Sequence, residues 1–123
     1  MGRVIHFDIG ADKPERVSKF YKDTFGWKFE KWNGPMSYWM ITTGNEKEPG
    51  INGGMGLKSD SGGMMSAMTI GVKDLDRTLK QIAANGGKVL QAKSAIPGVG
   101  WFASFLDTEG NTFGLMQDDK KAK

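Results

Sequence analysis

The sequence predicts an α+β fold in which two tandem βαβββ modules form a half-barrel around a concave pocket. A length of 123 residues, 38% of them hydrophobic, suffices for one domain with a single core. The chain also resembles itself at an offset of 61 residues. The residues that recur are Ile9-Gly10, Arg16 and Gly26, at Ile70-Gly71, Arg77 and Gly87. Both halves follow the order of one strand, one helix and three strands, which agrees with this repeat.

The first predicted strand covers residues 3–9, and its side chains alternate between two faces. One face is apolar and carries Ile5, Phe7 and Ile9. The other face carries Val4, His6 and Asp8. We expect the apolar face to pack against the helix of its own module. The other face then lines the pocket, which places His6, the only histidine of the chain, in the pocket wall.

The next segment predicts a helix that stops at Gly26. Asp12 is the expected N-cap, with Glu15 as its capping-box partner and Pro14 tolerated in the first turn. Apolar residues at helical spacing predict one buried stripe. This stripe consists of Val17, Phe20, Tyr21 and Phe25. Strands are expected at about residues 27–32, 37–43 and 51–58, with turn-forming segments between them.

A glycine-rich hinge at residues 59–66 leads to the second module. There the sequence predicts a strand at 66–72 and a helix that is capped by Asp74 and stopped by Gly86. The residues expected to face inward are Leu75, Leu79, Ile82 and Ala83. Strands at 88–92, 100–106 and 112–116 complete the module. Residues 1–118 are thus one domain with modules at about 3–60 and 64–117, followed by a charged, solvated tail at 119–123.

Composition excludes several classes of function. The absence of cysteine rules out disulfides, thiolate nucleophiles and cysteine-ligated zinc. No apolar run approaches the roughly 20 residues that span a bilayer, and the N-terminus lacks a secretory pattern, so we expect a cytoplasmic protein without membrane contact. The net charge of +3 comes without a basic stripe interleaved with aromatics, which argues against nucleic acid as a partner.

Three stretches of the chain resemble the vicinal oxygen chelate superfamily, which includes glyoxalase I, extradiol dioxygenases, fosfomycin-modifying enzymes and bleomycin-sequestering proteins. They are His6 followed by Phe20-Tyr21, then "FGW" at residues 25–27, and "DTEGNTFGLMQ" at residues 107–117. The resemblance covers about residues 3–117. It implies the half-barrel fold and a homodimer, and uncovered sheet edges also favour pairing of two copies.

The resemblance also implies four positions for metal ligands, on the first and last strand of each module. They fall on His6, Ala67 and Gly114, and near Gly53 within the segment "INGGMG". Because a divalent metal site needs several converging imidazole or carboxylate donors, and only His6 supplies one here, we expect no bound metal and no cofactor.

The residues expected to contact a ligand are His6, Asp8, Trp39, Thr69 and Trp101. Thr69 is included because the offset of 61 maps it onto Asp8. For His6 three interpretations stay open: an imidazole hydrogen-bonded to Asp8 or to a neighbouring strand, a ligand contact, or a general acid or base. No nucleophile or second base accompanies it, so catalytic residues are not assigned.

Three functions remain at this point. The first is a glyoxalase- or bleomycin resistance-like protein without a complete metal site that binds a small, partly apolar or aromatic molecule. The alternative is a divalent-metal-dependent lyase or dioxygenase of the same superfamily. The third is an interaction domain whose own side chains fill the cavity. Whether the chain is an enzyme is left open.

Overall fold

A computed structural model describes residues 2–60 and 66–123. The contacts divide the chain into two compact units. The first unit is His6–Ser66, and the second unit comprises Met1–Ile5 and Ala67–Lys123. The greater part of the predicted glycine-rich hinge, residues 61–65, lies outside the described residues.

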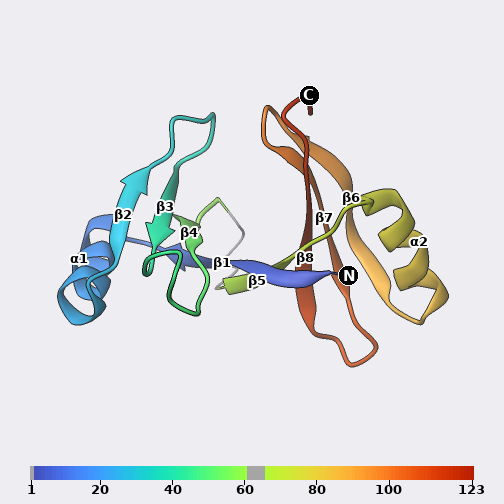
Figure 1. Cartoon of the computed structure of the whole chain (residues 1–123), viewed down its shortest axis with the longest axis horizontal. Helices are drawn as coiled ribbons and strands as arrows, with labels where there is room; N and C mark the ends of the chain where they lie inside the picture. Colours follow the sequence, from blue (N-terminus) through green and yellow to red (C-terminus); the bar gives the residue numbers. More distant parts are fainter. Residues whose placement is uncertain (1, 61–65) are drawn as a thin grey trace. The chain divides into compact units, whose positions relative to one another are not determined.

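The first unit contains one helix and a sheet with the strand order β2-β3-β4-β1 (Figure 1). Its elements are β1 (Arg3–Ala11), α1 (Pro14–Phe25), β2 (Lys28–Lys31), β3 (Tyr38–Thr42) and β4 (Gly53–Leu57). The residues Arg3–Ile5 at the start of β1 belong to the second unit. β1 runs parallel to β4, whereas β3 is antiparallel to both β4 and β2. A core of Ala11, Ile41 and Met55 holds the unit together, because all three are 4% exposed or less.

The start of α1 differs from the prediction. Lys13, not Asp12, is the N-cap, and no side chain caps the helix there. The reason is Pro14 in the first turn: a residue before proline avoids the helical region, so Lys13 stays extended at φ −125° and the helix begins one residue later. The predicted end is confirmed, since Gly26 adopts φ 76° and its N–H donates to the Lys22 carbonyl.

The predicted buried stripe of α1 is wrong in part. Val17 packs against the core, but Phe20 and Phe25 are 56% and 62% exposed. At about 100° per residue the latter two lie roughly 140° apart around the helix, so they fall on opposite margins of its buried face. Tyr21 lies between them and stacks on Trp27, with 4.6 Å between the ring centroids.

The second unit repeats the first, with the strand order β5-β8-β7-β6. Its elements are β5 (Ser66–Gly71), α2 (Leu75–Ala84), β6 (Lys88–Ile96), β7 (Gly100–Leu106) and β8 (Thr112–Asp118). β5 is parallel to β8, and β7 is antiparallel to both β8 and β6. The same pairing pattern in each unit confirms the predicted α+β class and its two tandem βαβββ modules.

α2 follows its prediction closely. The Asp74 carboxylate accepts a hydrogen bond from the Arg77 N–H at 3.0 Å, and the helix ends before Gly86, which has φ 95°. Leu75 is fully buried in a core with Ala103 and Leu115, against which Leu79 and Ile82 pack. The exception is Ala83, which is exposed because it lies about 100° around the helix from Ile82.

The charged tail is solvated at Lys120, Lys121 and Lys123, as the sequence predicts, but two of its residues make contacts with the second unit. Ala122 is only 2% exposed, and its carbonyl accepts a hydrogen bond from the Gly98 N–H at 3.0 Å. The Asp119 carboxylate accepts the indole N–H of Trp101, also at 3.0 Å. These contacts fix the tail on the second unit, although four of its five residues are polar. Among the described residues, no helix is long and apolar enough to cross a membrane.

Candidate functional site

A polar cluster lies on one face of the sheet of the first unit. Phe7 and Ile9 of β1 pack against the core, so the alternating residues His6 and Asp8 project from the opposite face. This assignment of faces agrees with the sequence. Tyr38, at the start of β3, joins the two side chains across β4.

The three side chains form a closed hydrogen-bonding triangle. The Tyr38 hydroxyl donates to Oδ1 of Asp8 at 2.5 Å. Nε2 of His6 lies 2.8 Å from the Tyr38 hydroxyl and 3.3 Å from Oδ1 of Asp8. The side chains of His6 and Asp8 are 28% and 37% exposed, so the cluster is accessible from solution.

Gly54 of β4 determines how Tyr38 lies. A Cβ atom on Gly54 would sit 1.5 Å from the Tyr38 hydroxyl and 2.0 Å from its Cζ. The phenol thus occupies the space directly above Gly54, and only glycine leaves room for it. A Cβ atom on Gly56, two residues further along the same face, would meet nothing within 4 Å. The face therefore has an open floor of bare backbone beside the phenol.

The environment keeps Tyr38 protonated. Burial, the negative charge of Asp8 and the hydrogen bond to that carboxylate all raise the pKa of the Tyr38 phenol far above its usual range. The hydroxyl therefore remains a donor to Asp8 throughout the range in which most proteins function.

Apolar groups flank the polar cluster. The ring of Trp32 contacts Tyr38 edge to face, with 6.2 Å between the centroids. Met40 shares the face of Tyr38 on β3, lies opposite Gly54 and is 45% exposed. A small polar centre with adaptable apolar neighbours suits a partly apolar molecule.

The five predicted ligand-contacting residues lie in different surroundings. Within the first unit, His6 and Asp8 are brought together. Trp39 follows Tyr38 on β3 and so faces the other way, against the core of the first unit. Trp101 packs against the core of the second unit and has Lys93 Nζ at 4.6 Å from its ring centroid. Thr69 is buried in the second unit, where β5 places it opposite Gly114.

The register corrects one position that the sequence repeat assigned. On β8, Gly114 pairs with Thr69, and the first unit has the equivalent pair of Gly54 with Asp8. The counterpart of Gly114 is therefore Gly54, one residue later than the Gly53 that an offset of 61 gives. A Cβ atom on Gly53 would instead meet the ring of Phe7 at 2.7 Å, on the core side.

Tyr38 is the member of this hydrogen-bonded cluster that the sequence analysis does not include. The signal was present in the alternation of β3: if Trp39 and Ile41 face the core, Tyr38 and Met40 must face the site. That the hydroxyl of Tyr38 reaches His6 and Asp8 depends on the empty space above Gly54, which no periodicity reveals.

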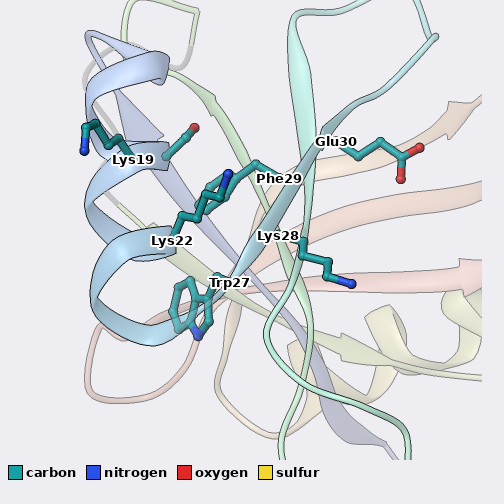
Figure 2. A pocket seen from close by; sticks show the side chains of 7 residues that line it. Lys19, Lys22, Trp27, Lys28, Phe29 and Glu30 are labelled. Atoms are coloured by element: carbon teal, nitrogen blue, oxygen red, sulfur yellow. The ribbon is translucent and has the colours of Figure 1, made fainter.

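A groove lies between α1 and β2 of the first unit (Figure 2). Its lining residues are Ser18, Lys19, Lys22, Trp27, Lys28, Phe29 and Glu30. Figure 2 shows Lys22 reaching from α1 toward Phe29, while Glu30 points away from the helix. Lys19 is paired with Asp23 at 2.5 Å. With three lysines and one glutamate, this groove has a positively charged rim, whereas the cluster around Asp8 is negative.

Comparison with known proteins places the chain in a family. Residues 3–115 match the profile of the Glyoxalase/Bleomycin resistance protein/Dioxygenase superfamily. The chain belongs to this superfamily. A glyoxylase-like domain-containing protein from Didymella fabae is 35% identical over 118 residues, which cover 93% of this chain and 92% of that protein.

Solved structures of superfamily type share the fold. A glyoxalase/bleomycin resistance protein/dioxygenase superfamily member from Vibrio splendidus superposes with a TM-score of 0.65 at 14% identity, covering 97% of this chain and 100% of the other. Methylmalonyl-CoA epimerase from Mycobacterium tuberculosis gives a TM-score of 0.64 at 18% identity, covering 94% and 87%. At these identities the likeness shows a common fold and nothing finer.

Proposed function

We propose that this glyoxalase-superfamily protein binds a small, partly apolar or aromatic molecule on the face that carries His6, Asp8 and Tyr38, and that it does so without a complete metal site. The observation that carries the proposal is the hydrogen-bonded triangle itself. It is a fixed, partly exposed polar centre beside the exposed Met40 and the open floor above Gly56.

The donor set supports the metal-free part of the proposal. His6 holds the first-strand position of the superfamily's metal ligands, but its Nε2 already faces the Tyr38 hydroxyl and Asp8. The last-strand positions are Gly54 and Gly114, which have no side chain to donate. Above Gly54, the space that a carboxylate side chain would need is filled by the phenol. Among the described residues, no group of three His, Cys, Asp or Glu side chains is placed to hold an ion.

Two measurements on the purified protein test this function. Titration with small aromatic compounds should quench tryptophan fluorescence, because Trp32 contacts Tyr38 at the edge of the site. Elemental analysis after dialysis should find no stoichiometric zinc, nickel, iron or manganese. A dialysis-resistant metal held by three or more side chains would overturn the proposal in favour of a metal-dependent lyase or dioxygenase. Absence of quenching would favour a domain with a self-filled cavity.

A further inference from the structure

The hydrogen bonds of the triangle determine where its protons lie. A phenol has one hydrogen, and that of Tyr38 goes to Asp8, so the hydroxyl can only accept from His6. Nε2 of His6 faces this oxygen at 2.8 Å and the Asp8 carboxylate at 3.3 Å, and both are acceptors. Nε2 must therefore carry the hydrogen. In the neutral imidazole this leaves Nδ1 without a hydrogen, as an acceptor.

The outward atoms of the cluster are acceptors as well. Neither Nδ1 of His6 nor Oδ2 of Asp8 has a hydrogen-bond partner within the described part of the chain. No described side-chain nitrogen or oxygen is both buried and unpartnered, so these two atoms reach the surface. The only ion pair of Asp8 in the described ranges is with His6. On β3 and β4 the same-face residues beside the cluster are Met40 and the two glycines, which offer no side-chain donor. On β2, one strand further from Asp8, Glu30 lies opposite Met40 and Lys28 lies opposite Thr42, so these two charges offset each other.

We infer that this face selects a hydrogen-bond donor, such as a protonated amine or an O–H or N–H group, carried on a flat apolar body, and that it rejects carboxylates and phosphates. The inference rests on the proposed function and names its ligand class. A donor at this point satisfies Nδ1 of His6 and Oδ2 of Asp8 together, and a cation gains further from the carboxylate charge. An anion would instead face the negative charge of Asp8 and the lone pairs of the two acceptor atoms. One methylmalonyl-CoA epimerase of the same fold has been solved with methylmalonyl-CoA; such an anionic ligand does not suit this cluster.

The test uses three probes of similar shape: benzylamine, benzyl alcohol and benzoate. Because the chain has one histidine, the ring signals of ¹⁵N-labelled histidine report on His6 alone. This readout also separates the site from the lysine-rimmed groove of Figure 2, where benzoate is expected to bind without moving the histidine signals.

We expect the spectrum to show the Nε2–H tautomer. Benzylamine should move the His6 signals at a concentration about tenfold lower than benzoate, which corresponds to one charge-assisted hydrogen bond. The Asp8→Asn variant should lose about tenfold in response to benzylamine and less in response to benzyl alcohol. Since Asp8 also holds Tyr38, the exposed Met40 supplies a second pair of variants: Met40→Glu should strengthen the benzylamine response, and Met40→Lys should weaken it.

Two results overturn the inference alone, namely an Nδ1–H tautomer or a stronger His6 response to benzoate than to benzylamine. A failure of all three probes to move the His6 signals overturns the proposed function together with the inference. Unchanged benzylamine binding in both Met40 variants also counts against the inference, because the charge of the face would then be irrelevant to the ligand.

Discussion

Replacing Gly54 by alanine should release the Tyr38 side chain and destabilise the protein. The new methyl group would lie 1.5 Å from the hydroxyl and 2.0 Å from Cζ, so the whole ring must swing away. The loss includes a hydrogen bond to a charged carboxylate, worth about 1.5–3 kcal/mol, here near the lower value because Asp8 is 37% exposed. Partial exposure of the ring adds about 1 kcal/mol. The expected decrease in the free energy of unfolding is therefore about 2.5–4 kcal/mol.

Gly56 provides the matched control on the same strand and face. Neither glycine has a positive φ, so alanine fits the backbone at both positions. At Gly56 the methyl group meets nothing within 4 Å. Reduced freedom of the unfolded chain should make Gly56→Ala neutral or more stable by up to about 1 kcal/mol.

Urea unfolding followed by tryptophan fluorescence measures both variants, with the slope m checked for constancy. The cause is isolated by a double-mutant cycle with Tyr38→Ala, which removes the ring. In that background Gly54→Ala should cost no more than Gly56→Ala, so the coupling between residues 54 and 38 should reach about 2 kcal/mol. Equal stabilities of the two alanine variants, or a coupling near zero, would refute the placement of the phenol above Gly54.

Three further outcomes are expected. The pKa of Tyr38 is raised in the folded protein, whereas the phenol of the unfolded chain ionises at about pH 10. Above that pH the unfolded chain loses a proton that the folded protein keeps. The free energy of unfolding should therefore fall by up to about 1.4 kcal/mol per pH unit. Urea titrations at several pH values compare the dependence of the free energy of unfolding on pH between the wild type and Tyr38→Phe. Identical dependence in the two proteins would contradict this prediction. Asp74→Ala should cost about 1 kcal/mol as a lost N-cap, whereas Asp12→Ala should stay within about 0.5 kcal/mol. We further propose a homodimer; light scattering should give twice the 13.5 kDa mass of the chain, and a monomeric mass at micromolar concentration would count against it.

The sequence predicts the architecture because local signals agree with the repeat. Alternation in β1 assigns its two faces, Gly26 marks the end of α1, and Asp74 caps α2. Where one local rule competes with another, the stronger steric constraint decides. Asp12 has the chemistry of a cap, but Pro14 holds Lys13 extended and moves the start of the helix beyond it.

The candidate site was predictable only in part, since its third member depends on space and not on residue type. His6 and Asp8 lie two residues apart on one strand, so alternation alone places them together. Tyr38 is 30 residues from Asp8, and a tryptophan next to it is the more conspicuous aromatic. The sequence predicts Trp39 and Trp101 as ligand contacts, and in the structure each packs against the core of its own unit.

The most recognisable motif of the chain serves the fold. In "DTEGN", one carboxylate oxygen of Asp107 accepts the backbone N–H groups of Glu109 and Asn111, and the other accepts the Asn111 side-chain amide. These bonds lower the pKa of Asp107, and Gly110 adopts φ 83° to complete the turn. All of these contacts lie within the turn between β7 and β8, so the motif has a structural role there and does not identify a ligand.

The chemistry of the first unit instead depends on a choice between two residues for one space. A side chain at position 54 and the phenol of Tyr38 in its present position exclude each other, because a Cβ atom alone would overlap the hydroxyl. A carboxylate side chain at position 54 would displace Tyr38, and Nε2 of His6 would lose its nearer acceptor. The imidazole of His6 and the carboxylate at position 54 would then both be available to bind a cation. With glycine there, the phenol fixes the imidazole on one tautomer and leaves an acceptor facing outward. The absence of a ligand residue at Gly54 is therefore the condition for the Tyr38–His6–Asp8 cluster, and the two features must change together.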